Sequence, residues 1–202
     1  TLPSIEVLRR FPRSTLAPST ALVTSVDCFG NATGSATVNV SGGTAPYALS
    51  WNTAPVQSGA TASALTAGSY TCTITDANGC PASVAVTITG PAAPLAAAIS
   101  GQQNVSCTGG ANGSATVNAT GGTAPYTYDW NTAPVQSTPT ATGLAAGPYT
   151  CTVIDANGCT TEVSAMIDQP AAAISVSIGR TTQATCGNQN GGALAVANGG
   201  TA

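Results

Sequence analysis

Apolar and polar residues alternate along several short stretches of the chain. The apolar side chains of Ala36, Val38 and Val40 alternate with polar ones, and two glycines at 42–43 then turn the chain. A period of two is typical of a β-strand that buries one face. Further strands are expected at 47–51, more weakly near 60–65, and at 70–74 and 84–88. Short strands separated by Gly and Pro signals predict an antiparallel β-sandwich.

The order of the marker residues narrows the fold. A tryptophan, Trp51, falls on the third strand, and Tyr70 stands two residues before Cys72 at the start of the sixth. This layout is typical of an immunoglobulin-like domain with a tyrosine corner. The side chains expected to be buried in this domain are Tyr47, Leu49, Trp51, Tyr70, Cys72 and Ile74.

The segment 76–79 has the sequence Asp-Ala-Asn-Gly. Its oxygens could be offered to calcium, but the segment lacks the alternating carboxylates and the closing Glu of a calcium loop. A tight hairpin turn needs these same residue types. We therefore interpret it as a turn and predict no metal site.

The whole pattern recurs after 79 residues without a gap. The core markers Trp51 and Tyr70 correspond to Trp130 and Tyr149 in the second copy. A fixed period indicates a tandem array of small domains. The register predicts a final strand of a preceding repeat, two complete sandwich repeats and the start of a further repeat, at 1–11, 12–90, 91–169 and 170–202.

The two ends of the chain are expected to be incomplete domains. Ile5 and Val7 lie in the register of Val84 and Val86, as in a last strand, and 170–202 supply only two first strands. Either the polypeptide continues, or neighbouring copies complete each other by strand addition. We favour continuation, because the two ends together lack the tryptophan strand and the tyrosine strand of a whole sandwich.

Composition excludes several classes of function. Only 5% of the residues are charged, the net charge is −3, and three of the four arginines lie in the first 13 residues, so no basic face is available for nucleic acid. The chain has no histidine and no nucleophile elbow, which predicts a protein that is not an enzyme and has no catalytic or cofactor-binding residues. No membrane span and no signal peptide are recognised. Seven cysteines without histidine favour disulfides in an oxidising compartment over zinc.

Longer motifs resemble a known family. Gly-Gly-Thr-Ala-Pro-Tyr followed by Trp-Asn occurs at 42–52 and 121–131, and Gly-x-Tyr-Thr-Cys-Thr followed by Asp-Ala-Asn-Gly-Cys occurs at 68–80 and 147–159. Together these motifs resemble the SprB-type repeat of very large cell-surface adhesins of gliding bacteria. The resemblance implies secretion to the cell surface and a filamentous adhesive role, with no catalytic residues to carry over.

The resemblance also bears on the cysteines. It implies a disulfide between Cys28 and Cys80, whereas a strictly immunoglobulin-like topology would place these two at opposite ends. That topology favours Cys28 with Cys72, or Cys28 with Cys159 of the next repeat. Connectivity does not follow from sequence, so the three pairings stay open. The disulfide candidates are Cys28, Cys80, Cys107 and Cys159, and the chain departs from the family pattern, which usually has a valine-like core residue, at Cys72 and Cys151.

These observations predict an extracellular structural protein, the shaft of a cell-surface filament or adhesin. Its expected partners are neighbouring repeats or other copies of the chain. The alternative is a carbohydrate-binding array with surface polysaccharide as the partner, which needs exposed aromatic side chains. Since Trp51 and Trp130 fall on inward-facing positions, we rank this alternative second.

Overall fold

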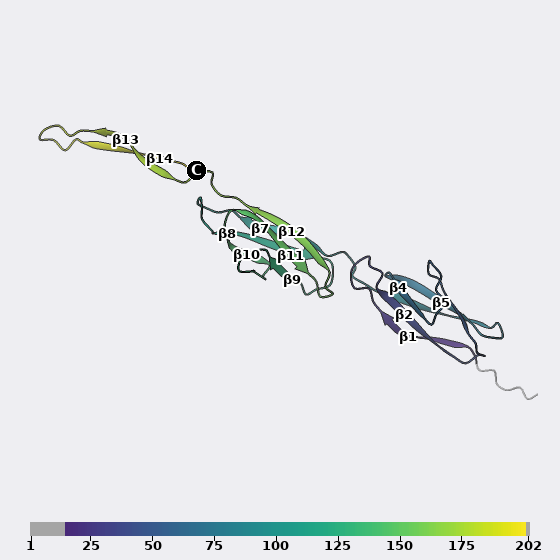
Figure 1. The fold of residues 1–202 in the computed structure, drawn as a ribbon. Helices are drawn as coiled ribbons and strands as arrows, with labels where there is room; N and C mark the ends of the chain where they lie inside the picture. The colour runs from purple at the N-terminus through teal and green to yellow at the C-terminus, as the bar shows by residue number, and fades with distance from the viewer. Residues whose placement is uncertain (1–14, 201–202) are drawn as a thin grey trace, which may run out of the picture. The chain divides into compact units, whose positions relative to one another are not determined.

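The computed structural model describes residues 15–200; the strand predicted at 1–11, with Ile5 and Val7, lies outside these residues. Within 15–200 all regular structure is β, with fourteen strands and no helix (Figure 1). The strands form separate antiparallel sheets. The chain forms two compact units, with the boundary between Pro94 and Leu95. The all-β fold class predicted from alternation is confirmed.

The first unit contains six strands. Strand β2 pairs with β1 and β4 to form one antiparallel sheet, and β5 pairs with β3 and β6 to form the other. In an immunoglobulin domain these positions are A-B-E and C-F-G, so the unit is an immunoglobulin-like sandwich. The strand bounds are β1 (Ala17–Thr24), β2 (Gly34–Ser41), β3 (Ala48–Trp51), β4 (Thr61–Leu65), β5 (Gly68–Thr75) and β6 (Pro81–Ile88).

The strand that carries Tyr70 is the fifth of this unit, not the sixth as expected. Between β3 and β4 the described chain forms a loop at 52–60 in place of a further strand. In this loop the Thr53 hydroxyl donates to the Pro55 carbonyl at 2.8 Å and accepts from the Gln57 N–H at 3.1 Å. A segment whose backbone groups bond to its own side chains, and which contains a proline, has fewer groups to offer to a strand ladder.

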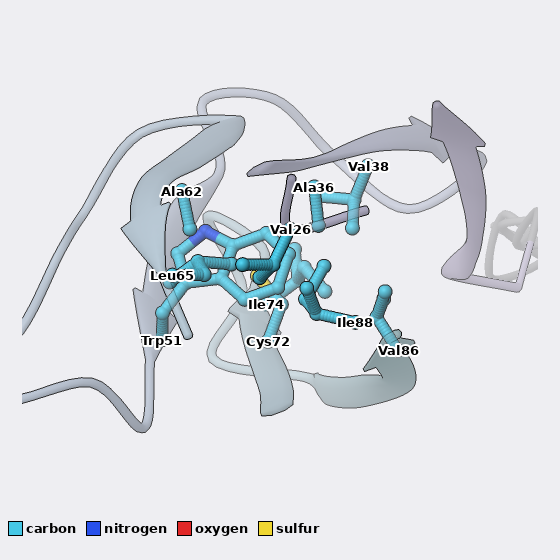
Figure 2. Packing of buried hydrophobic residues seen from close by; sticks show 10 residues of the cluster. All are labelled: Val26, Ala36, Val38, Trp51, Ala62, Leu65, Cys72, Ile74, Val86 and Ile88. Carbon is cyan, nitrogen blue, oxygen red and sulfur yellow. The ribbon is translucent and has the colours of Figure 1, made fainter. Parts of the chain in front are cut away.

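The core of the first unit lies between its two sheets (Figure 2). Trp51 is 1% exposed, and Cys72 and Ile74 are fully buried. They pack with residues from the facing sheet, among them Ala36 and Val38. The inward face predicted from alternation is therefore the buried face for these residues.

Three residues expected in the core are only partly buried, namely Tyr47, Leu49 and Tyr70. The two tyrosines lie at the edge of the core because each hydroxyl donates to a backbone carbonyl. Tyr47 donates to Gly42 O at 2.6 Å, and Tyr70 donates to Thr66 O at 3.1 Å. The second contact is the tyrosine corner that the marker order predicted.

The second unit begins with a sandwich of the same design. Strand β8 pairs with β7 and β10, and β11 pairs with β9 and β12, all antiparallel. Trp130, Cys151 and Val153 are buried in its core. The bounds are β7 (Ala96–Gln103), β8 (Gly113–Thr120), β9 (Thr127–Trp130), β10 (Thr140–Leu144), β11 (Gly147–Ile154) and β12 (Thr160–Ile167).

The last two strands, β13 (Ser175–Thr182) and β14 (Gly192–Asn198), pair only with each other. They hold the positions of β1 and β2, yet Leu194 and Val196 are 59% and 37% exposed where Ala36 and Val38 are buried. The reason is that the described residues supply no second sheet to cover this hairpin.

Candidate functional site

Each tryptophan is fixed inside its sandwich. The Trp51 indole N–H donates to Gly59 O at 2.9 Å, and the Trp130 indole N–H donates to Thr138 O at 3.0 Å. Both residues are 1% exposed. An indole that is buried and hydrogen-bonded cannot stack on a sugar ring in solvent. The tryptophans therefore serve the fold.

The 76–79 segment is a turn whose carboxylate accepts hydrogen bonds from the backbone on both oxygens. Asp76 Oδ1 accepts from the N–H groups of Asn78 and Cys80, both at 2.9 Å, and Asp76 Oδ2 accepts from Thr44 N at 3.1 Å. The bond from Cys80 N–H, with those from Thr44 and Asn78, lowers the pKa of Asp76 although burial opposes the shift. Both oxygens of the side chain are thus used to tie the β5–β6 turn to the β2–β3 loop.

Asp155 makes the same contacts in the second sandwich. Its oxygens accept from the N–H groups of Thr123, Asn157 and Cys159, at 2.9 Å in each case. Burial raises the pKa of Asp155, but these backbone donors outweigh it, so the pKa is lowered overall. Among the described residues, no group of three or more His, Cys, Asp or Glu side chains could hold a metal ion.

The loop between β3 and β4 is a surface feature, held by side-chain hydrogen bonds, that sequence reasoning missed. The Gln57 side chain bonds both backbone groups of Ser63, with Nε2 donating to the carbonyl and Oε1 accepting from the N–H, each at 2.9 Å. At the tip of this clamped loop Val56 is 69% exposed. The second sandwich repeats the arrangement, with Val135 65% exposed. The near-verbatim repetition of 52–58 at 131–137 was the available signal.

Cys28 and Cys80 lie at opposite ends of the first sandwich. Cys28 follows Val26, whose N–H donates to Thr89 O just beyond the end of β6. Cys80 instead precedes Pro81, the first residue of β6. Eight strand residues at about 3.3 Å each separate the two ends by roughly 25 Å, whereas a disulfide needs Cα atoms about 4.4–6.8 Å apart.

The same separation holds in the second sandwich. Val105, two residues before Cys107, donates to Asp168 O after the end of β12, whereas Cys159 precedes β12. A bond within either repeat between its loop cysteine and its turn cysteine is therefore excluded. The pairing of Cys28 with Cys80, which the family resemblance implied, is wrong, because each sandwich holds the two sulfurs at different ends.

The oxidation states of the cysteines differ between equivalent positions. Cys28 and Cys159 are disulfide-bonded. Cys80, Cys107 and Cys186 are exposed thiols. The buried thiols are Cys72 and Cys151, whose pKa values are raised by burial. The pairing of Cys28 with Cys72 is therefore not formed either.

Each sandwich has a hollow at one of its ends. At the turn end of the first sandwich a hollow is lined by Leu16, Thr44, Asp76 and Cys80, among others. At the loop end of the second sandwich Cys107 lines a hollow. Two of the exposed thiols, Cys80 and Cys107, thus line these hollows. None of the described residues forms a helix that could cross a membrane.

Comparison with solved structures finds other multidomain proteins. The three N-terminal domains of the highly immunogenic outer capsid protein (Hoc) of bacteriophage RB49 are 14% identical, with 94% of this chain and 70% of that chain covered and a TM-score of 0.47. The N-terminal eight Ig domains of Down syndrome cell adhesion molecule are 21% identical, with 82% and 25% covered and a TM-score of 0.36. For Dpr2 Ig1-Ig2 in complex with DIP-Theta Ig1-Ig3 the identity is 14%, the coverage 80% and 69%, and the TM-score 0.30.

Comparison of sequences gives a more specific result. No curated protein sequence matches the chain. The family model of the SprB repeat matches at residues 20–56 and 100–135, which begin within β1 and β7 and end in the exposed loops after β3 and β9. The chain therefore carries the SprB repeat at two places, as its Gly-Gly-Thr-Ala-Pro-Tyr and Trp-Asn motifs indicated.

Proposed function

We propose that this chain is part of an extracellular structural array, the shaft of a cell-surface filament or adhesin built from repeats joined in series. The observation that carries the proposal is the SprB repeat, found at two places and in each case within an immunoglobulin-like sandwich. Arrays of such units stabilise themselves repeat by repeat and extend by duplication.

The use of the polar and aromatic side chains supports a structural role. Trp51 and Trp130 fill cores, and the Asp76 and Asp155 carboxylates hold turns. These are the residue types that a sugar-binding or catalytic site would need in an exposed position. In both sandwiches these tryptophan and aspartate side chains stabilise the fold. The repeats therefore act as structural spacers and carry no catalytic or sugar-binding role.

Antibody labelling of the cells that make the protein tests the proposal. Fab fragments raised against the 202-residue chain are applied to intact cells and to permeabilised cells, and are viewed by electron microscopy. We expect label on intact cells, distributed along surface fibres and abolished by the free chain as competitor. Label that appears only after permeabilisation would contradict the proposal.

The carbohydrate-binding alternative has its own measurement. Surface polysaccharide extracted from the same cells is titrated into the chain while Trp fluorescence and heat are recorded. We expect no saturable heat signal. Saturable binding, reduced in a Val56→Asp, Val135→Asp variant that changes both exposed loop tips, would replace the structural role by a recognition role.

A further inference from the structure

We propose that the outer edge of β14 is an interaction surface for a second copy of this chain, and that two β14 strands pair antiparallel about a two-fold axis at Ala195. The inference goes beyond the proposed function, because it assigns a contact between copies to one strand, whatever the array does. In the part of the chain that the structure describes, β14 pairs with β13 alone, whereas β2 and β8 each pair with two strands. Among these residues, the edge of β14 that faces away from β13 therefore has no strand beside it.

The same edge binds a strand in both complete sandwiches. The Val38 N–H donates to Ala60 O and the Val117 N–H donates to Pro139 O, each at 2.9 Å, next to the first residues of β4 and β10. By register, the residue of β14 in this position is Ala195. Its N–H and C=O groups therefore point to the outer edge. So do those of the residues two positions before and after it, because alternate residues of an antiparallel strand bond to the same side.

The pairing register establishes this correspondence. Thr20 and Ile178 are each the fourth residue of the first strand of their hairpin, and a bulge follows each of them. Thr20 pairs with Val38, and Ile178 pairs with Ala195. The segment from the loop cysteine to the glycine pair has one residue fewer in the third repeat than in the first. Register, and not the position within the strand, therefore sets which residues of β2 and β14 are equivalent at this edge.

The side chains at this edge differ between the repeats. In the first sandwich Thr37 and Thr61 join β2 to β4 through their hydroxyls at 2.8 Å, and the second sandwich has the equivalent bond at 3.0 Å. Leu194 holds this position in β14, since it pairs with Arg180 after the bulge as Thr37 pairs with Leu22. A leucine cannot form the hydroxyl bond. The edge of β14 is thus matched to a strand that presents an apolar side chain.

The sequence of β14 is complementary to itself. It reads Ala-Leu-Ala-Val-Ala from 193 to 197 and is nearly symmetric about Ala195. Around a two-fold axis at Ala195, Ala193 faces Ala197 of the second copy, and Leu194 faces Val196 of the second copy. The three alanine pairs exchange about six backbone hydrogen bonds, and the two leucine–valine pairs lie at the non-hydrogen-bonded positions, where side chains are closer. A contact of this kind uses the same surface on both copies and closes at a dimer.

The edge of β14 is accessible and uninterrupted. Leu194 is 59% exposed and Val196 is 37% exposed. The strand contains no proline and no charged residue, and the bulge of the hairpin lies in β13. It therefore lacks the prolines, bulges and charges by which edge strands avoid pairing with other chains. A strand of 7 residues on each copy covers less than the about 1,000 Å² that a stable interface buries, so the dimer is weak and depends on concentration.

Analytical ultracentrifugation of the 202-residue chain tests the proposal, with the exposed thiols of Cys80, Cys107 and Cys186 replaced by serine to prevent random cross-links. We expect a reversible dimer whose population grows with concentration. Leu194→Lys changes both leucine–valine pairs and should raise the dissociation constant about tenfold or more. The control Ser177→Lys adds the same charge to β13 and should change the constant far less. A parent chain that stays monomeric at every concentration, or a dimer that Leu194→Lys leaves intact, would overturn the proposal.

Mixed disulfides test the register of the two strands. Leu194→Cys and Val196→Cys variants in the same serine background are mixed and mildly oxidised, with one variant isotope-labelled so that mass identifies each dimer. The proposed pairing places these two positions opposite each other, with Cα atoms about 4.5 Å apart, which a disulfide can span. We expect the mixed dimer to outweigh both homodimers. A statistical distribution of the three dimers would overturn the proposal, and this result does not depend on how strongly a lysine disturbs the hairpin.

Discussion

Replacement of Trp51 by alanine tests whether the sandwich depends on its central tryptophan. The side chain is 1% exposed, so the substitution removes nearly the whole indole from contact with the core. Large-to-small changes of this kind cost about 3–5 kcal/mol, through lost transfer energy and the cavity left behind. Loss of the indole bond to Gly59 O adds about 1 kcal/mol. A domain of this size is stable by only about 5–10 kcal/mol, so the first sandwich should be close to unfolding.

The assay uses the two tryptophans as separate reporters. In the Trp51→Ala chain, the tryptophan fluorescence comes from Trp130 alone and follows the second sandwich, whereas far-UV circular dichroism follows both sandwiches. We expect the circular dichroism to show a new transition at low urea and the fluorescence midpoint to stay within error of the parent. Trp51→Phe, which keeps a large aromatic ring, should lose clearly less stability than the alanine variant.

The outcome that would refute this reasoning is specific. If Trp51→Ala melts with a single transition at the parental urea midpoint by both probes, the indole does not support the core. The aromatic face would then have to be reconsidered as a surface for ligands. The reciprocal variant Trp130→Ala, in which only Trp51 emits, provides the mirror-image control.

Three smaller effects are also expected. Tyr70→Phe removes the corner bond to Thr66 O and should cost about 1 kcal/mol in urea melting, with parental stability contradicting a role for the corner. The lowered pKa values of Asp76 and Asp155 mean that their stabilisation is present above the unfolded pKa near ~4 and is lost as the pH falls through the folded values, so asparagine variants should flatten the acid limb of a stability–pH curve. Cys72→Val, in a buried site without a disulfide, should change stability by less than about 1.5 kcal/mol, and native Cys72 should resist iodoacetamide until the chain unfolds.

The parts of the fold that were predicted from sequence are those whose strands bury one face. Strand β2 alternates because Ala36 and Val38 face the core while the residues between them face outward. A strand before β2 was implied by the place of Trp51 on the third strand, but the bounds of β1 were not predicted, because β1 is an edge strand that buries almost nothing. A bulge between Thr20 and Leu22 also shifts its phase. Alternation reports burial, so a strand without burial gives no such signal.

The cysteines and the clamped loop could not be predicted for a different reason. Whether Cys28 meets Cys80 depends on which end of the sandwich each occupies, and only the strand order determines that. The Gln57 clamp on Ser63 likewise needs two strands and a loop to be in place. The spacing of residues along the chain predicts the sandwich fold. The contacts at the ends and in the loops of the sandwich depend on the assembled fold and could not be predicted in this way.

The edges of the two sheets affect how closely copies can be crowded. In the first sandwich β3 has only four residues and β4 only five, β1 contains Pro18 and a bulge, and β6 starts at Pro81. Proteins usually guard such edges with lysine, and this chain has none. The short edges of β3 and β4 and the bulged, proline-bearing edge of β1 offer few consecutive backbone groups for another sheet to extend. Copies of the sandwich that meet at these edges are therefore less prone to join by strand pairing.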